Sequence, residues 1–328
     1  MTDLPTTTNG KKVFSCFSCG GGSSLGYKRA GFEVIGNVEI DKSASAAYVR
    51  NLKPKYNFCM DLRDFNALDN LPAELYALDI LDGSPPCTPF SISGRREKHW
   101  GVEKKFREGQ KLQTLDDLFF VFLETVKKLR PKIVIAENVK GLIQGNAKGY
   151  VNQILHGFKN LGYDVQIFQL NAAFMNVPQV RERIFFIANN QKYPRLKLDF
   201  NNTPILFKDV RTAQGIPIGD GITTKRLEYL LPTDTMIADI TARTENKWTG
   251  FCTKIYQDDR IAPTLTHCGV SIRACDKTKL SAGDYINIST FPQDYDFSRA
   301  SVKYLCAMSV PPNMTANLAT EIYKQWLK

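Results

Sequence analysis

The residues with the clearest chemical potential lie around Cys87. An apolar run over residues 76–81 predicts a strand, and the Gly83-Ser84-Pro85-Pro86 segment ends it, because proline has no backbone N–H for a strand ladder. Cys87 therefore stands at the carboxyl end of a predicted strand, where open α/β sheets bind their ligands. Since a cysteine thiolate is a strong nucleophile, Cys87 is a candidate for covalent catalysis, and a buried inert thiol is the alternative.

A carboxylate follows at the end of another apolar run. Residues 131–136 predict a buried strand that delivers Glu137 to the sheet edge at which Cys87 is expected. A cysteine and a carboxylate at neighbouring strand ends can act as nucleophile and proton donor. Glu137 is therefore the second candidate for catalysis.

Two arginines extend this candidate site. Residues 177–187 predict a further strand, in which the alternation of Gln179, Arg181 and Arg183 places these three side chains on one face. Charged side chains inside an otherwise apolar strand are costly unless they have partners. Arg181 and Arg183 are therefore expected to belong to a site.

The amino-terminal sequence has the pattern of a nucleotide-binding unit. Residues 12–17 predict a strand, Gly20-Gly21-Gly22 a tight turn, and residues 23–30 a helix, which is the order that opens a Rossmann-type unit. The next predicted strand ends in Glu39, whose carboxylate can accept hydrogen bonds from ribose hydroxyls. A third ends in Asp61, which can accept a hydrogen bond from an adenine amino group or cap the following turn.

The elements that must position these residues alternate regularly between strand and helix up to about residue 189, and include an amphipathic helix over residues 112–129. We expect an α/β fold with a Rossmann-like catalytic and cofactor-binding domain formed by residues 12–189 and 301–328. Residues 190–300, in which short strand-like pieces are separated by turn residues, predict a smaller, β-rich and irregular domain. Residues 1–11 read as a flexible arm.

The charge of the chain points to an anionic partner. The net charge is +10 in 328 residues and the pI is about 9.1, which makes nucleic acid the first candidate. A basic stretch that begins at Arg95-Arg96 suits a loop over a phosphate backbone or a merely solvated loop. The basic residues of the smaller domain, which could hold phosphates or form an ordinary wet surface, are Lys208, Arg211, Lys225, Arg226, Arg243, Lys247, Lys254, Arg260 and Arg273.

Other classes of protein are disfavoured. No stretch approaches the roughly 20 continuous apolar residues of a membrane span, and the amino end lacks the pattern of a signal peptide. Eight cysteines in a chain of this length suggest reduced intracellular thiols, so we expect a cytoplasmic protein. Cys16 and Cys19 have the spacing of half a zinc site, but no second close pair follows, and no metal is expected.

These residues, in this order, resemble the DNA (cytosine-5) methyltransferase family of prokaryotic and phage type. The resemblance rests on Pro85-Pro86-Cys87, Glu137-Asn138-Val139 and Gln179-Val180-Arg181-Glu182-Arg183 at family-like spacing. Phe17 to Gly22 and Val310-Pro311-Pro312 add weaker support. The resemblance implies a class I methyltransferase fold, with residues 190–300 as the target-recognition domain. It also implies S-adenosylmethionine as the methyl donor, S-adenosylhomocysteine as the product, and double-stranded DNA as the partner.

The implied mechanism uses four residues of the chain. The target cytosine is flipped out of the duplex, because its reacting atoms are inaccessible while it is stacked. Cys87 then attacks C6 while Glu137 holds N3 and the exocyclic amine, so that C5 can accept a methyl group. Arg183 holds O2 of the base, and Arg181 orders the site and a phosphate.

The resemblance also implies contacts to the cofactor and to DNA. Phe17 stacks on the adenine, Glu39 binds the ribose and Asp61 holds the adenine amine. The full set of expected cofactor residues is Phe17, Ser18, Gly20, Gly21, Glu39, Ile40, Asp61, Leu62, Pro86, Leu118 and Ser309. The expected DNA contacts are Ser91, Arg95, Arg96 and Gln179.

The chain departs from the family pattern at Cys19, Thr88 and Met308, none of which is a catalytic candidate. Three alternatives stay open: a tRNA cytosine-5 methyltransferase of the same fold, a DNA-binding relative without catalysis, and a nicotinamide dehydrogenase. The last would leave the Pro-Pro-Cys and Gln-x-Arg-x-Arg segments unexplained. We expect a monomer, and the resemblance leaves open a companion restriction endonuclease.

Overall fold

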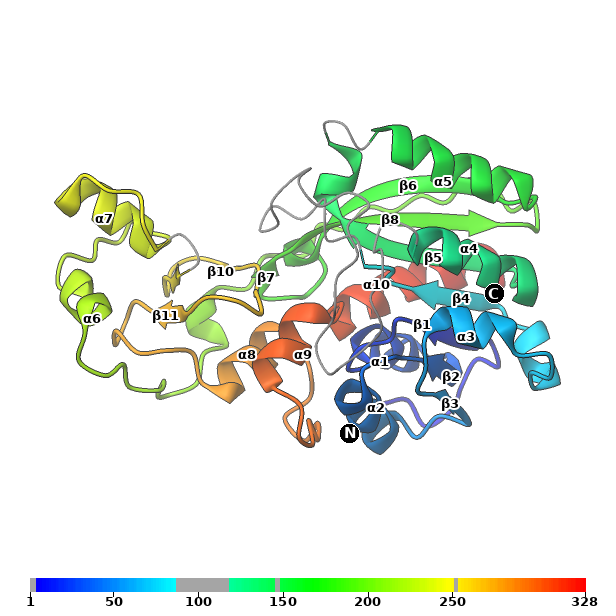
Figure 1. Ribbon diagram of the computed structural model, residues 1–328, viewed down its shortest axis with the longest axis horizontal. Coiled ribbons are helices and arrows are strands. Elements are labelled where there is room, and N and C mark those ends of the chain that lie inside the picture. Colours follow the sequence, from blue (N-terminus) through cyan, green and yellow to red (C-terminus); the bar gives the residue numbers. More distant parts are fainter. Residues whose placement is uncertain (1–3, 87–117, 145–147, 251–252) are drawn as a thin grey trace. The chain divides into compact units, whose positions relative to one another are not determined.

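The computed structural model describes residues 4–86, 118–144, 148–250 and 253–328 (Figure 1). It divides into two compact units. The sheet unit comprises Thr2–Leu170, Glu182–Asp199 and Thr315–Lys328, and the small unit comprises Asn171–Arg181 and Phe200–Met314. Five residues singled out above lie outside the described residues: Cys87, Thr88, Ser91, Arg95 and Arg96.

The sheet unit is built on a seven-stranded sheet with the order β3-β2-β1-β4-β5-β8-β6. Strands β3, β2, β1, β4 and β5 run parallel, and β8 is antiparallel to β5. This sheet confirms the Rossmann-like expectation. The strand bounds are β1 (Lys12–Cys16), β2 (Glu33–Val38), β3 (Tyr56–Phe58), β4 (Ile80–Gly83), β5 (Ile133–Val139), β6 (Asp164–Asn171) and β8 (Glu182–Asn189).

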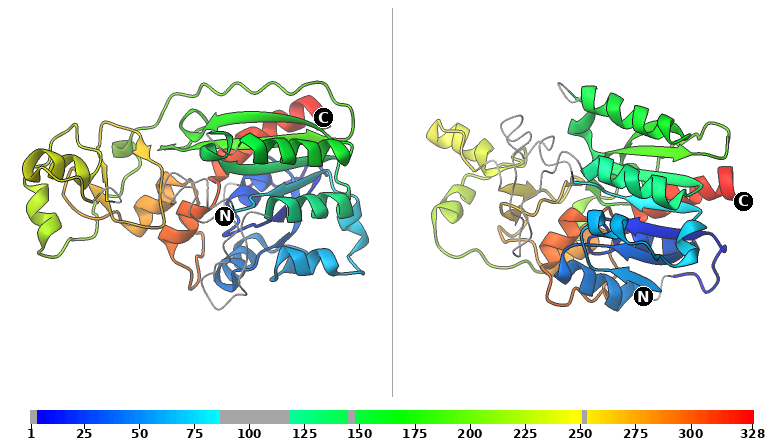
Figure 2. Two further views of the ribbon diagram at one scale, coloured as in Figure 1. Left: turned by 45° about the horizontal axis from the view of Figure 1, so that its top comes forward. Right: turned by 45° about the vertical axis from the view of Figure 1, so that its right-hand side comes forward.

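Helices lie on both sides of this sheet (Figure 2). Two adjacent residues of β4 show the two faces: Asp82 contacts Ser23 and Tyr27 of α1, whereas Gly83 lies against Phe122 of α4. The helices are α1 (Gly22–Arg29), α2 (Lys42–Leu52), α3 (Leu62–Ala67), α4 (Leu118–Leu129), α5 (Lys148–Asn160) and α10 (Pro312–Ile322), with shorter turns η1 (Ala73–Tyr76), η4 (Lys140–Ile143) and η8 (Tyr323–Leu327).

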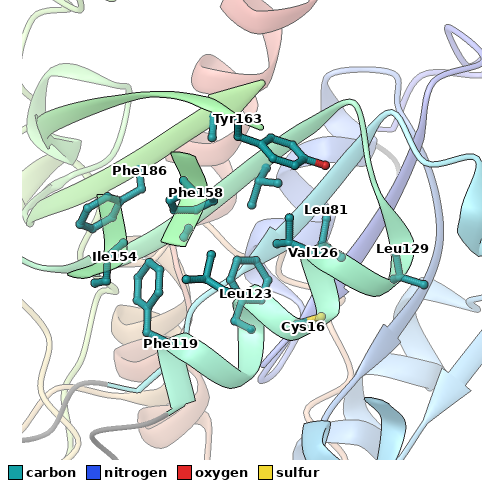
Figure 3. Close-up of a cluster of buried hydrophobic side chains, with 14 of the residues drawn as sticks. Cys16, Leu81, Phe119, Leu123, Val126, Leu129, Ile154, Phe158, Tyr163 and Phe186 are labelled. Carbon is teal, nitrogen blue, oxygen red and sulfur yellow. The ribbon is translucent and has the colours of Figure 1, made fainter. Parts of the chain in front are cut away.

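The hydrophobic core that fixes the strand ends lies between the sheet and helices α4 and α5 (Figure 3). Phe119 of α4 packs edge-to-face on Phe186 of β8, with 5.3 Å between the ring centroids. Strands β1 and β4 contribute Cys16 and Leu81 to the same cluster. The helix predicted over residues 112–129 is confirmed in its described part, which begins at Leu118.

The strand order places two loops at the point where the winding of the sheet reverses. Strand β1 lies between β2 and β4, so the chain leaves β1 toward one side and reaches β4 on the other. Ligands of open α/β sheets bind outside the carboxyl ends of the strands at such a point. The glycine turn that follows β1 and the Ser84-Pro85-Pro86 segment that follows β4 both begin there.

Two strand predictions need correction. The strand expected over residues 76–81 begins only at Ile80, because Ala73–Tyr76 form a 3₁₀ turn. The single strand expected over residues 177–187 is two strands, β7 (Gln179–Val180) and β8, interrupted at Arg181. The cause is a change of partner, since β7 pairs with β10 of the small unit whereas β8 pairs with β5.

The small unit is irregular, as expected, and its strands are only two or three residues long. Two pairs of parallel strands, β7 with β10 (Ala262–Pro263) and β9 (Lys254–Tyr256) with β11 (Ser271–Arg273), join long irregular segments. Helices that the sequence did not predict lie between them. The helices of this unit are α6 (Ile222–Leu227), α7 (Ile237–Glu245), α8 (Ala282–Ile288) and α9 (Val302–Met308), with turns η6 (Ala172–Phe174) and η7 (Phe207–Asp209).

The units divide the chain at other residues than the expected domain bounds. Residues 171–181 and 301–314 belong to the small unit, and residues 190–199 to the sheet unit. In the described parts of the chain, no helix is long and apolar enough to cross a membrane.

Candidate active site

The segment that leads to Cys87 is held by the neighbouring strand. The Asn138 side chain, at the end of β5, donates a hydrogen bond to the Pro85 carbonyl at 3.2 Å, and Asn138 is buried. Gly83 lies so close to the Phe122 ring that a Cβ atom at this position would come within 2.5 Å of it. The chain leaving β4 is therefore held against α4 at Gly83 and by β5 at Pro85.

Glu137 and Arg183 form an ion pair at the ends of adjacent strands. The Arg183 Nε atom lies 2.9 Å from Glu137 Oε1, and the two side chains are 15% and 11% exposed. Among the described residues, Glu137 Oε1 accepts no well-aligned hydrogen bond, so charge holds the pair together. A buried carboxylate oxygen in this state keeps the capacity to accept or share a proton with a substrate.

Arg181 and Gln179 are placed differently from the prediction. Both belong to the small unit, whereas Arg183 belongs to the sheet unit, so the three side chains do not share the face of one strand. Arg181 is 2% exposed, and its Nη1 donates to the Ala307 carbonyl at 2.9 Å.

Gln179, expected to contact DNA, is fully buried. Its Oε1 accepts a hydrogen bond from the Leu265 N–H, and its Nε2 donates to the Ile288 carbonyl. Gln179 therefore links segments of the small unit, and a contact with DNA would require these two bonds to be exchanged.

The turn between β1 and α1 has a conformation suited to binding through the backbone. Phe17, Cys19 and Gly21 have positive φ angles of 53°, 46° and 81°. No side chain caps the amino end of α1, and its first turn holds no acidic residue. Free N–H groups at a helix amino end attract anionic groups, so this turn fits the carboxylate of an amino-acid-like cofactor.

Glu39 connects this turn to the end of β2. Its carboxylate accepts hydrogen bonds from the N–H groups of Cys19 at 2.7 Å and Asp41 at 2.8 Å. Glu39 is 8% exposed, and burial raises its pKa to about 7 despite these bonds. The position of Cys19, where the chain departs from the family pattern, is thus fixed by the residue expected to bind the ribose.

The other predicted cofactor residues are distributed over both units. Asp61 caps α3 by accepting from the Arg63 N–H at 2.8 Å, so the capping role that the sequence left open is the one the structure contains. Ser309 lies in the small unit, and its hydroxyl is buried without a hydrogen-bond partner among the described residues. Ser18 accepts a hydrogen bond from the buried Asn37 amide at 3.0 Å.

The remaining members of the set differ in exposure. Gly20, Gly21, Leu62 and Leu118 are buried, Phe17 and Ile40 are half-buried, and Pro86 is exposed. Phe17 packs against the core cluster of the sheet unit. The Phe17 ring, directly after β1, is therefore held in place by the core, as a ring that stacks on an adenine must be.

Sequence reasoning missed Asp82, a buried acid on β4. It is 4% exposed, and its carboxylate accepts hydrogen bonds from the hydroxyls of Ser15, Ser23 and Tyr27. Burial raises its pKa to about 6. An acid inside the run Ile80-Leu81-Asp82-Gly83 was the available signal, because an ionisable side chain in a buried strand needs a special environment.

Three of the arginines expected in the small unit form ion pairs within that unit. Arg211 contacts Asp258 at 2.9 Å, Arg226 contacts Glu245 at 2.6 Å, and Arg243 contacts Asp234 at 2.9 Å.

Arg273 is completely buried between Asp276 and Asp284. Five basic residues of the predicted set are exposed: Arg243, despite its ion pair, and Lys208, Lys225, Lys247 and Arg260.

Comparisons with known proteins point to one family. The family described as C-5 cytosine-specific DNA methylase matches residues 11–324. Type II methyltransferase M.AplI of Arthrospira platensis is 34% identical over 221 residues, which are 66% of this chain and 58% of that protein. Orphan methyltransferase M.SPRI of Bacillus phage SPR is 32% identical over 235 residues, which are 67% of this chain and 49% of that protein. The chain thus spans about half the length of these curated relatives.

Solved structures share the fold. A prophage protein from E. coli described as a DNA modification methyltransferase superposes with a TM-score of 0.67 at 19% identity, covering 97% of this chain and 100% of that chain. A DNMT2 mutant of Spodoptera frugiperda superposes with a TM-score of 0.61 at 16% identity, covering 95% and 99% of the two chains.

Proposed function

We propose that this chain, which belongs to the C-5 cytosine-specific DNA methylase family, transfers a methyl group from S-adenosylmethionine to C5 of a cytosine extruded from duplex DNA. The observation that carries the proposal is the ion pair between Glu137, near the carboxyl end of β5, and Arg183, near the amino end of the antiparallel strand β8. Strand β5 pairs directly with β4, which leads to Cys87. A nucleophile, an acid and a cation are thereby connected to neighbouring strands of one sheet.

The chemistry assigns one role to each of these residues. The Cys87 thiolate forms a bond to C6 of the cytosine, and the ring electrons move toward C5. Glu137 holds N3 and the exocyclic amine and supplies a proton at N3. Arg183 holds the base O2, where negative charge increases as the thiolate adds. C5 then accepts the methyl group, which leaves S-adenosylhomocysteine. Loss of the C5 proton returns the C–H electron pair to the ring, and the C6–S bond breaks to release the Cys87 thiolate. Arg181 is proposed to order the site and a phosphate.

S-adenosylmethionine, when bound, supplies an electrophilic methyl group. The uncapped amino end of α1 suits its carboxylate, Glu39 suits the ribose hydroxyls, and Phe17 suits the adenine face. The buried hydroxyl of Ser309 has no hydrogen-bond partner among the described residues, so it is available to form a hydrogen bond with the bound cofactor. Asp61 completes the set if its carboxylate accepts the adenine amine beside its capping bond.

The small unit is proposed to recognise the DNA sequence. Its exposed cations Lys208, Lys225, Lys247 and Arg260 suit phosphate contacts, as do Arg95 and Arg96 beyond the described residues. We place the protein in the cytoplasm, acting on DNA as a monomer. A companion endonuclease would make it part of a restriction–modification pair.

The test begins with bisulfite sequencing of DNA from cells that express the protein, which identifies the methylated sequence. A duplex that carries 5-fluorocytosine at that position is then incubated with the protein and S-adenosylmethionine. Because fluorine cannot leave as the C5 proton does, the wild type should remain covalently bound to the duplex.

Two variants and a second substrate complete the design. Cys87→Ser should form no adduct, whereas Cys59→Ser, which alters an exposed thiol elsewhere in the chain, should form it as the wild type does. Labelled methyl transfer to DNA and to tRNA distinguishes the two substrates. An adduct formed by Cys87→Ser, or labelling of tRNA alone, would contradict the proposal.

A further inference from the structure

Two buried carboxylates flank the turn that is proposed to bind the cofactor. Glu39 accepts a hydrogen bond from the N–H of Cys19, which directly precedes Gly20. Asp82 accepts a hydrogen bond at 2.5 Å from the hydroxyl of Ser23, which directly follows Gly22. Residues 19 and 23 therefore each bond to a buried acid, and the glycines lie between them.

Within the part of the chain that the structure describes, the donors to Asp82 are all neutral. Ser15 on the adjacent strand donates at 2.8 Å, and Tyr27 on α1 donates at 3.2 Å. Among the described residues, no Lys, Arg or His side chain lies within ion-pair distance of Asp82 or Glu39. Burying an acid without a cation is costly, and burial accordingly raises the pKa of both groups.

Asp79, at the other end of β4, gives the contrast. It is also buried, but its carboxylate contacts Lys132 Nζ at 2.8 Å and accepts from the Lys12 N–H. Asp79, directly before β4, is therefore paired with a cation, whereas Asp82, near the carboxyl end of β4, has no cationic partner among the described residues. The uncompensated one lies at the end where the ligand is expected.

The other titratable groups that face Asp82 do not compensate it. Cys16 on β1, Tyr27 on α1 and Tyr48 on α2 each have a raised pKa, to which the Asp82 charge contributes, and are neutral at pH 7. Glu137 on β5 is an acid that adds to the same negative field. Among the described residues, the carboxylate of Asp82 is therefore left without a compensating positive charge.

We propose that Asp82 is a specificity-determining residue whose uncompensated carboxylate favours the sulfonium of S-adenosylmethionine over the neutral thioether of S-adenosylhomocysteine. The inference rests on the proposed function, because it takes this cofactor as the ligand of the glycine turn. The two ligands share the adenosine, the amine and the carboxylate. They differ by one methyl group and one positive charge, so a buried negative charge is the physical means of telling them apart. Weaker binding of S-adenosylhomocysteine helps this product to dissociate after each methyl transfer.

The test measures binding of both ligands to the full-length protein by titration calorimetry, with no DNA present. Asp82→Asn should reduce the ratio of the S-adenosylhomocysteine Kd to the S-adenosylmethionine Kd by about tenfold, mainly through weaker binding of the sulfonium. Asp79→Asn, the matched control on the same strand, should leave the ratio unchanged. Ser15→Ala, which removes one bond but keeps the charge, should also leave it unchanged.

Proton release gives a second measurement that a purely structural role would not affect. A bound cation lowers the pKa of a nearby acid, so S-adenosylmethionine should displace protons from the wild type between pH 5.5 and 7. Titrations in buffers of different ionisation enthalpy count these protons. The wild type should release more protons with S-adenosylmethionine than with S-adenosylhomocysteine, and the variant should show a smaller difference.

Two outcomes would overturn the inference: an unchanged Kd ratio in Asp82→Asn with S-adenosylhomocysteine binding intact, or equal proton release by the two ligands in the wild type. Equal proton release by the wild type overturns the inference even where Asp82→Asn does not fold, and the smaller difference expected for Asp82→Asn is what assigns the protons to Asp82 and not to Glu39. These results are independent of methyl transfer. A protein that binds both ligands but methylates no DNA would refute the proposed function alone.

Discussion

Replacing Glu137 with glutamine separates the chemical role of this residue from its role in stability. Glu137 and Arg183 are 11% and 15% exposed and lie 2.9 Å apart. Removing one partner of a fully buried ion pair costs about 3–5 kcal/mol, because the remaining charge is left without compensation. The glutamine carbonyl can still accept a hydrogen bond from the guanidinium, and the site is partly solvated. We therefore expect Glu137→Gln to reduce the free energy of unfolding by about 2 kcal/mol.

A loss of that size cannot explain a large loss of activity. Folded proteins have unfolding free energies of about 5–15 kcal/mol, so a variant that loses about 2 kcal/mol remains overwhelmingly folded at 25 °C. A positioned proton donor contributes about 10²- to 10⁴-fold to rate. The single-turnover rate of methyl transfer by Glu137→Gln should therefore fall at least about 100-fold, while binding of S-adenosylmethionine stays near the wild-type value.

The assay combines urea unfolding, calorimetric binding and transfer of labelled methyl groups to the identified site. Lys140→Met is the control, because Lys140 pairs with Glu182 in a more exposed setting, with side chains 29% and 40% exposed. That substitution should change stability by about 0–1 kcal/mol and leave the methyl-transfer rate within a few-fold of wild type. A Glu137→Gln rate within tenfold of the wild-type rate would refute the assignment of a proton-donating role.

Three further predictions concern stability. Gly83→Ala should destabilise the protein by about 1–3 kcal/mol in urea unfolding, because its Cβ would come within 2.5 Å of the Phe122 ring, and Phe122→Leu in the same chain should recover part of the loss. Burial raises the Glu39 pKa from 4.5 to about 7, so its contribution to stability is greatest below pH 4.5 and is lost as the pH rises to 7. Between pH 5 and pH 8, the free energy of unfolding of the ligand-free wild type should decline by about 2.5 kcal/mol more than that of Glu39→Gln, and an equal decline in the two proteins would contradict this prediction. Arg273→Met should cost about 3–5 kcal/mol, because Asp284 is fully buried and loses its cation, whereas Arg273→Met with Asp284→Leu should be milder.

Local patterns were enough to predict the parts of the site that each lie within one strand and its following turn. The strand–glycine–helix order located the turn after β1, and the carboxylate at the end of a predicted strand located Glu39. The apolar run before Glu137 likewise predicted β5, although this strand continues through Glu137 to Val139. In each case a short segment contains the whole signal.

The features that were missed depend on partners far away in the chain. Alternation over residues 177–187 is the same whether a segment pairs with one sheet or two, so the break at Arg181 could not be read from it. The ion pair of Arg211 depends on Asp258, 47 residues away. The network around Asp82 depends on hydroxyls 55 to 67 residues away. Composition shows that such groups exist, but only the fold brings them together.

Under the proposed function, in which the small unit recognises DNA, the break at Arg181 determines which residues must be exchanged to transfer a new sequence specificity. A graft of residues 200–314 from a relative would leave residues 171–181 behind, although they belong to the same unit. Gln179 would then lose its bonds to Leu265 and Ile288, and Arg181 its bond to Ala307. A chimaera should therefore exchange both pieces of chain together, with one junction between Arg181 and Glu182.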